Sequence, residues 1–211
     1  MNVSDFLKEE PKDMICLADY FPEHALTLLH GKQGSGKSYS TLKAFNDIGI
    51  EPLFIAVEDT TGLGDLKKHY LSESLLSNMI NEKSIKGLDN KVVIIDTYSR
   101  LHEQLHNDGY SDLEILQLFE SMIERYNITL IVIGHTRNFV GKDGIFDDNT
   151  MLARGVAEEL FIEKTVYKAT SKILARVEYN LHVVKGRGTG GTKIVPNWMR
   201  KPSKIKVQDD N

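Results

Sequence analysis

Short runs of apolar residues, separated by more polar segments, form the main pattern of this sequence. The clearest runs are four to six residues long and carry mainly β-branched or long aliphatic side chains: Ala25–His30, Pro52–Val57, Val92–Ile95 and Leu130–Ile133. Polar residues do not alternate with the apolar ones, which is typical of strands that are covered on both faces, as in a parallel sheet. We therefore predict a parallel sheet with helices in the connecting segments.

The segment before the last of these runs has the pattern of a crossover helix. Its apolar residues recur at helical spacing, at Leu113, Leu116, Phe119 and Ile123. Ser111 and Glu114 form the Ser-x-x-Glu capping box that begins a helix. The pattern predicts a helix over Ser111–Tyr126.

The second half of the chain has a different pattern, with short strand-like segments joined by polar turns and glycines. The predicted strands are Leu160–Glu163, Lys172–Tyr179, Leu181–Lys185 and Thr192–Val195. The fold class is therefore α/β, with a mainly parallel central sheet flanked by helices and a C-terminal antiparallel hairpin region. We divide the chain into an N-terminal segment (1–24), one domain (25–198) and a polar, frayed tail (199–211).

Composition places the chain among soluble globular proteins. It has 211 residues, of which 41% are hydrophobic and 27% charged. The formal charge of −4 does not by itself indicate nucleic-acid binding, so any such contact must come from local patches. No apolar run approaches the roughly 20 residues that a membrane-spanning helix needs. Cys16 is the single cysteine, which excludes an internal disulfide and fits a reducing cytoplasm.

The strongest chemical signal is the segment Gly31–Ser38, GKQGSGKS, which matches the phosphate-loop pattern Gly-x-x-x-x-Gly-Lys-Ser/Thr. A predicted strand precedes it and the helix-competent segment Tyr39–Asn46 follows. Glycines let backbone N–H groups surround phosphate oxygens, and the helix adds its positive dipole end. Lys37 is expected to reach the β- and γ-phosphates, and Ser38 to bind Mg²⁺. The predicted nucleotide-binding residues are Gly31, Lys32, Gln33, Gly34, Ser35, Gly36, Lys37, Ser38 and Tyr39.

Polar residues at the ends of the other predicted strands extend this site, because ligands of open α/β sheets lie beyond the carboxyl ends of the strands. Asp96 ends the third run and is placed to hold the magnesium shell. Glu58, favoured over Asp59, follows the second run and is a candidate general base. His135 follows the fourth run and is a candidate sensor of the γ-phosphate. The alternative roles are a cap or turn residue for Asp96, a solvated loop acid for Glu58 and a structural histidine for His135.

A pair of cations lies on the glycine-rich segment near the C-terminus, HVVKGRGTGG. Lys185 and Arg187 are two residues apart on an extended segment, so both project to one side. Such a tip can reach a phosphate in a neighbouring subunit, as an arginine finger does. The alternative is two solvated charges on a hairpin.

Taken in order, these residues resemble the RecA-like ATPase core, in the branch of RepA-type plasmid helicases, replicative hexameric helicases and their single-domain phage relatives. The resemblance spans about Ala25 to Trp198. It rests on the phosphate loop, FIAVED at Phe54–Asp59, VVIIDT at Val92–Thr97, IGHTR at Ile133–Arg137 and KGRGTGG at Lys185–Gly191.

The resemblance implies an ATPase that uses ATP and Mg²⁺ and works as a ring or filament, with nucleotide at the interfaces of a homo-oligomer. By the same resemblance Glu58 is the catalytic base, Asp96 the magnesium-shell acid and His135 the γ-phosphate sensor. Lys185 and Arg187 are then donated across a subunit boundary.

In the resembled family, DNA is gripped by the loops after the third and fourth strands, here Arg100–Tyr110 and Arg137–Arg154. The second loop has cations for phosphates and Phe139 for stacking on a base, which indicates single-stranded DNA as a partner. It also has Asp143, Asp147 and Asp148, which repel phosphates. A nucleotide-sensing loop explains the composition equally well.

Other readings stay open. A lysine in the second loop position, here Lys32, also occurs in MinD- and ParA-type ATPases, where it acts across a dimer. Those enzymes, however, usually have glycine where Gln33 stands. A nucleotide-gated switch acting on a protein partner belongs to a different functional class. A small-molecule kinase is disfavoured, because no arginine-rich lid occurs between Asp96 and Leu130.

The segment His102–His106, HEQLH, matches the zinc-protease pattern His-Glu-x-x-His. It follows the Asp96 strand, where a loop or a short helix is expected, and Asn107-Asp108-Gly109 then breaks the chain. That break leaves little room for the long buried helix of a zinc protease. We therefore attribute the pattern to chance.

Overall fold

The structure, a computed structural model, describes residues 15–56, 70–71, 92–135, 139–140, 145–146, 152, 155–167, 176–186, 193–196 and 198. Three helices and twelve strands are described there. The helices are α2 (Lys37–Asp47), α4 (Tyr98–Asn107) and α5 (Asp112–Tyr126). The strands are β1 (Cys16–Leu17), β2 (Phe21–Pro22), β3 (Leu26–Gly31), β4 (Leu53–Ala56), β5 (Tyr70–Leu71), β6 (Val92–Asp96), β7 (Thr129–His135), β8 (Phe139–Val140), β9 (Ile145–Phe146), β10 (Glu158–Tyr167), β11 (Arg176–Gly186) and β12 (Lys193–Val195).

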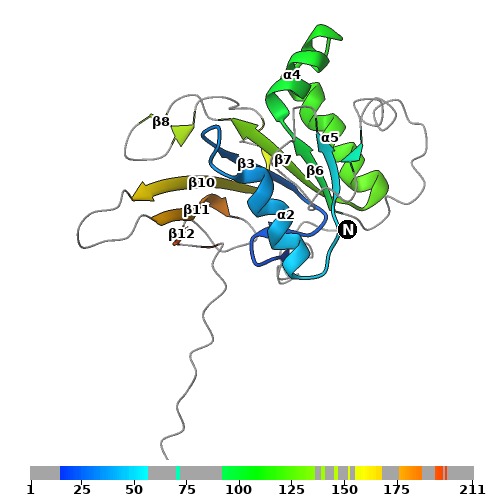
Figure 1. The fold of residues 1–211 in the computed structure, drawn as a ribbon. Coiled ribbons are helices and arrows are strands. Elements are labelled where there is room, and N and C mark those ends of the chain that lie inside the picture. Colours follow the sequence, from blue (N-terminus) through cyan, green and yellow to red (C-terminus); the bar gives the residue numbers. More distant parts are fainter. Residues whose placement is uncertain are drawn as a thin grey trace, which may run out of the picture.

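Eight of the described strands form one sheet in the order β12-β11-β10-β3-β7-β6-β4-β5 (Figure 1). The strands from β10 to β5 pair in parallel, whereas β11 and β12 are antiparallel to their neighbours. The predicted fold class, a mainly parallel sheet ending in an antiparallel hairpin region, is therefore confirmed.

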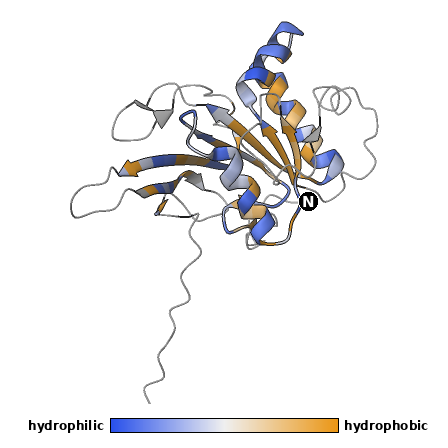
Figure 2. Cartoon of the chain, viewed as in Figure 1, coloured by the Kyte–Doolittle hydropathy of each residue, from blue (hydrophilic) through white to orange (hydrophobic). Residues whose placement is uncertain are grey.

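Both faces of the sheet are buried because helices lie on each side of it. Successive residues of β6 alternate between two cores: Val92 and Ile94 pack on the side of α2, and Val93 and Ile95 on the side of α4 and α5. The apolar strands therefore lie at the centre of the molecule, with the hydrophilic surfaces of the helices outside (Figure 2). Burial on both faces explains why the strand sequences show no polar alternation.

The predicted helix over Ser111–Tyr126 is confirmed as α5, with Ser111 as its N-cap. The Ser111 Oγ accepts from the Glu114 backbone N–H, and the Glu114 carboxylate accepts from the Ser111 backbone N–H at 2.8 Å, so the capping box is complete. One part of the predicted apolar stripe is wrong: Leu113 is half exposed. The buried stripe has the same helical period but begins two residues later, at Ile115. Its members are Ile115, Leu116, Phe119, Met122 and Tyr126.

A second correction concerns the C-terminal hairpin region. The predicted strands Lys172–Tyr179 and Leu181–Lys185 were separated by a turn, but residues 176–186 form one strand, β11. Asn180, the residue between the predictions, pairs with Glu163 of β10. The long ladder with β10 gives Asn180 backbone partners, and this outweighs its local preference for a turn.

Residues near the start of the described chain pack onto the same core. Phe21 of β2 is fully buried, and its ring lies 5.0 Å from that of Phe45 on α2.

No described helix has both the length and the apolar character needed to cross a membrane.

Candidate functional site

The glycine-rich loop lies at the carboxyl edge of the sheet, between β3 and α2. β3 has β10 on one side and β7 on the other, and both pair with it in parallel. The loop is therefore flanked by the ends of strands that come from distant parts of the sequence. This is the position at which open α/β sheets bind ligands.

Close packing explains two of the loop glycines. Gly36, the N-cap of α2, has a left-handed φ of 82°, and a Cβ there would lie 3.0 Å from the Tyr179 ring. A Cβ on Gly31 would lie 2.5 Å from the backbone oxygen of Ile162 in β10. The loop thus rests directly on β10 and β11.

Lys37, the first residue of α2, is 4% exposed and points back under the loop. Its ammonium group donates to the backbone oxygens of Gly31 at 2.9 Å and Lys32 at 3.0 Å. It also lies 3.1 Å from Nδ1 of His135. The loop carbonyls therefore hold the charged group of Lys37 beneath the loop.

The contact with Lys37 defines the tautomer of His135. An ammonium group has only donors, so Nδ1 of His135 is the acceptor in this contact and a ring proton is on Nε2. The parallel pairing of β3 with β7 brings the two groups together, because Gly31 lies directly opposite His135. With Nδ1 facing Lys37, the Nε2 side of the His135 ring faces away from that lysine.

The hydroxyl of Ser38 donates a hydrogen bond to the carboxylate of Asp96. Asp96 ends β6 and is 8% exposed. Its neighbours in the sheet are Ala56 of β4 and Ile133 of β7. A hydroxyl and a carboxylate oxygen side by side are the hard oxygen ligands that Mg²⁺ takes in phosphate-loop proteins. The donor set therefore fits the expected ion.

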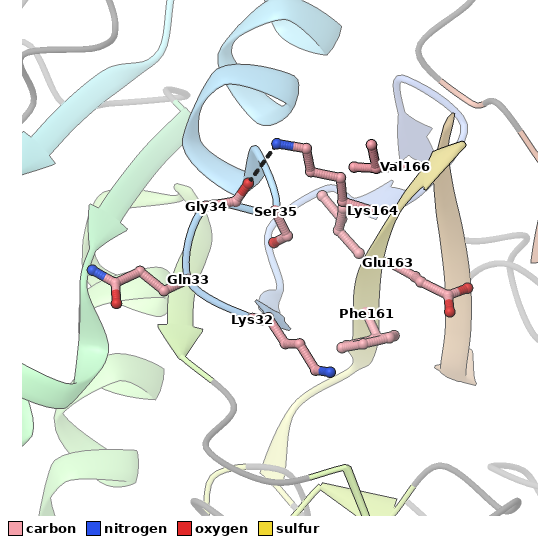
Figure 3. A pocket seen from close by; sticks show the side chains of 9 residues that line it. Lys32, Gln33, Gly34, Ser35, Phe161, Glu163, Lys164 and Val166 are labelled. Atoms are coloured by element: carbon pink, nitrogen blue, oxygen red, sulfur yellow. Dashed lines mark hydrogen bonds between the residues drawn. The ribbon is translucent and has the colours of Figure 1, made fainter. Parts of the chain in front are cut away.

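A pocket of about 450 Å³ opens between the loop and β10 (Figure 3). Lys32 reaches into it from the loop and Phe161 from β10, and the Lys164 ammonium donates to the Gly34 oxygen at 3.3 Å. The Phe161 ring lies between His30 and His182, with centroids at 5.7 and 5.5 Å. The full lining comprises Lys32, Gln33, Gly34, Ser35, Phe161, Ile162, Glu163, Lys164 and Val166.

Ser35 adds an unpaired polar group to this pocket. Its side chain is 3% exposed, and its Oγ has no hydrogen-bond partner within the described parts of the chain. Buried hydroxyls are normally hydrogen-bonded. The Ser35 hydroxyl is therefore a polar group of the loop whose hydrogen-bonding capacity is unused in the described residues.

The structure thus brings together most of the predicted site. The loop, Lys37, Ser38, Asp96 and His135 meet at one edge of the sheet. Tyr39 is on α2, and its side chain is 46% exposed.

The remaining predicted site residues are not described. Glu58 and Arg187 lie outside the described residues, as do Asp59 and most of the predicted DNA-binding loop Arg137–Arg154. The backbone of Lys185 pairs with Glu159 in the β10–β11 ladder, but its side chain is outside the described part.

The other segment predicted to grip DNA, Arg100–Tyr110, is helical over most of its length. Residues 100–107 belong to α4, so the segment after β6 is a short helix rather than an open loop.

Sequence reasoning missed the residues of β10 and β11 that line or support the pocket, notably Phe161, Lys164 and Tyr179. They carry no motif, and they reach the loop only because β10 pairs with β3. The apolar run at Leu160–Ile162 was the only sequence signal that pointed to this strand.

A mainly parallel sheet, helices on both faces, a glycine-rich loop after a central strand and a C-terminal antiparallel hairpin define the chain as RecA-like in fold. The sequence matches no protein-family model and no curated protein sequence. Among solved structures it is similar to flagellar accessory protein FlaH from Methanocaldococcus jannaschii, with a TM-score of 0.56. The identity is 12%, over 84% of this chain and 88% of that one, so the likeness concerns the fold.

Proposed function

We propose that this chain is an ATPase that binds ATP with Mg²⁺ at the Gly31–Ser38 loop and hydrolyses it. One observation carries the proposal: the Ser38 hydroxyl and the Asp96 carboxylate are in contact beside the buried ammonium of Lys37. Lys37 and Ser38 come from the start of α2, and Asp96 from the end of β6. They supply an oxygen pair for a metal and a cation for phosphates at a single point.

Each group has a distinct task. Lys37, held by the loop carbonyls, neutralises phosphate charge, and the Ser35 hydroxyl donates to a phosphate oxygen. Ser38 and Asp96 hold Mg²⁺, which when bound neutralises the charge that develops on the phosphate oxygens. His135 donates from Nε2 toward the γ-phosphate, since its Nδ1 faces Lys37.

Glu58 is proposed as the general base that orients the attacking water. Two facts support this role. β4 ends beside β6, with Ala56 paired to Asp96. Glu58 then follows Ala56 by two positions in the sequence.

We further propose that the ATPase works as a homo-oligomer on single-stranded DNA, in replication or recombination. The sequence resemblance supports both parts of this proposal. In addition, Lys185 belongs to β11, a strand that β10 separates from β3. We therefore assign Lys185, and Arg187 two positions later in the sequence, to the nucleotide of a neighbouring copy. A nucleotide-gated switch that acts on a protein partner is the alternative, and it predicts slow turnover that DNA does not change.

The first test is ATP turnover with and without single-stranded DNA at low salt. Wild type should hydrolyse ATP, and Lys37→Ala should lose both binding and turnover. Lys43→Ala is the matched control, because Lys43 lies on the same helix and forms an ion pair with Asp47 at 2.8 Å, away from the loop. Equal turnover in wild type and Lys37→Ala would refute the ATPase proposal. Turnover that stays constant through a DNA titration would refute the DNA part and favour the switch.

The second test concerns the intersubunit site. Arg187→Ala and Lys37→Ala should each be inactive alone, and mixing them should restore part of the activity, because some interfaces regain both groups. No recovery at any mixing ratio would show that each site is completed within one chain.

A further inference from the structure

A second cluster of metal-ligating side chains lies far along the chain from the loop, at the junction of α4 and α5. His102 and His106 are one turn apart on α4, and Asp112 is the first residue of α5. The Nε2 atoms of both histidines lie 2.7 Å from the same oxygen, Oδ1 of Asp112. Among the described residues, these three form the one cluster of histidine, cysteine and carboxylate ligands that are close enough to share an ion.

From this convergence we propose that His102, His106 and Asp112 form a binding site for a divalent transition-metal ion, with zinc as the reference ion. All the ligand atoms lie within 4.8 Å of one another. Ligand atoms around a tetrahedral zinc are about 3.3–3.6 Å apart, given bonds of about 2.0–2.2 Å. For the ion to bind, the Asp112 oxygen therefore has to move away from each histidine nitrogen by only about 0.7 Å.

The ligand types select the class of metal. Imidazole nitrogen suits zinc, copper and nickel, whereas Mg²⁺ and Ca²⁺ prefer sites made of oxygen alone. Two imidazoles and one carboxylate also leave one position of a tetrahedral ion open to water or another ligand. The site is therefore distinct in chemistry from the Ser38–Asp96 pair.

The surrounding structure holds the ligands in place before any metal arrives. The His102 ring packs against Tyr98 at 5.2 Å, and Tyr98 in turn packs against the buried Phe119 at 6.2 Å. The capping box at Ser111 fixes the first turn of α5, where Asp112 lies. Ligands on short, anchored side chains lose little conformational entropy on binding.

The ligands are also accessible from solvent. The side chains of His102, His106 and Asp112 are 27%, 44% and 47% exposed, respectively. The junction of α4 and α5 projects from the sheet at the top of Figure 1, and its outer end is hydrophilic in Figure 2. An ion can enter without any rearrangement of the core.

The chain break that argued against a zinc-protease helix is what builds this site. α4 ends at Asn107, and a turn through Asp108 and Gly109 reverses the chain. The reversal returns Asp112 to the histidines as a third ligand. The His-Glu-x-x-His pattern is thus a surface metal site that joins two helices, and it lacks the long buried helix of a protease.

Zinc titration of untagged protein, stripped of metal and free of nucleotide, tests the proposal. Competition with a chromophoric chelator gives stoichiometry and affinity. Wild type should bind one more equivalent of zinc than the double variant His102→Ala/His106→Ala. Loss of outer-shell contacts alone weakens metal sites about 10- to 100-fold, so removal of a ligand in His106→Ala or Asp112→Ala should weaken zinc binding at least about tenfold.

Glu103→Ala is the matched control, because Glu103 is exposed on the same helix and is not one of the three ligands. It should bind zinc as wild type does. Zinc should also raise the Tm of wild type and of Glu103→Ala but not of the double variant. Far-UV circular dichroism without metal confirms that each variant is folded.

Cobalt substitution supplies a readout independent of affinity. Co²⁺ bound to wild type should show the intense visible absorption of a four-coordinate ion, and the double variant should not. Two results would overturn the proposal. The first is zinc binding of equal stoichiometry and affinity in wild type and the double variant. The second is no zinc binding by wild type at a zinc concentration of about 100 μM, because protein zinc sites bind far more tightly than that.

Discussion

Replacing Gly31 by alanine tests how tightly the loop is seated against β10. The added Cβ would lie 2.5 Å from the Ile162 backbone oxygen and 3.0 Å from the Ser35 hydroxyl. The first neighbour is backbone of an adjacent strand and cannot rotate away. Ordinary contact begins at 3.4 Å, so the start of the loop or β10 must move by roughly 1 Å.

The expected cost follows from overpacking in a dense interior. Forcing a methyl group into such a site destabilises a protein by about 1–3 kcal/mol, which for a chain of this size lowers Tm by about 2–12 °C. Because the displaced groups belong to the phosphate loop, nucleotide affinity should fall as well. Thermal unfolding followed by circular dichroism and binding of a fluorescent ATP analogue measure the two effects.

Gly134→Ala is the matched control on the neighbouring strand β7. There the new Cβ would meet the His30 Cβ and a Leu28 methyl group at 3.7 Å, an ordinary contact distance. Gly134 is not among the described glycines with positive φ, so this substitution should change stability by less than about 1 kcal/mol. If Gly31→Ala unfolds at the same temperature as Gly134→Ala, the close seating of the loop on β10 is wrong.

Three further outcomes follow from the structure. Leu116→Ala should cost about 2–5 kcal/mol in unfolding free energy, and Leu113→Ala, on the exposed face, less than about 0.5 kcal/mol; denaturant titration distinguishes them. Ser111→Ala should cost about 1 kcal/mol through loss of the N-cap. Hydrogen bonds from the Ser111 side chain and backbone hold the pKa of Glu114 below its ordinary 4.5. The stability that Glu114 contributes is therefore present above pH 4.5 and lost as pH falls through the folded-state pKa; unfolding of wild type and Glu114→Gln across this range measures it.

Much of the fold could be predicted from sequence because its signals are local. The four apolar runs became β3, β4, β6 and β7, since strands buried on both faces need apolar residues at every position. The helix at α5 was predicted together with its cap, because the capping box is a contact between residues three apart. Errors arose where several local patterns competed. Leu113 fits a helical stripe as well as Ile115 does, and only the position of the sheet selects the stripe that is buried.

Some residues of the candidate site could likewise be predicted from the sequence, and others could not. The phosphate loop, with Lys37 and Ser38, was evident in the sequence because one short segment contains all its parts. Asp96 and His135 were found because parallel strands end at the same edge of a sheet. Phe161 and Lys164 were not found, because no rule in the sequence says that β10 pairs with β3.

The sequence by itself therefore determined the strands, the capped helix and the glycine-rich loop, all of which depend on contacts within a few residues. Only the tertiary structure decided that β10 closes the pocket beside the loop, and that Asp112 returns to His102 and His106. Both arrangements join residues that are brought together by strand pairing and helix packing. Those choices depend on the burial of the whole sheet, and no single segment of the chain carries that information.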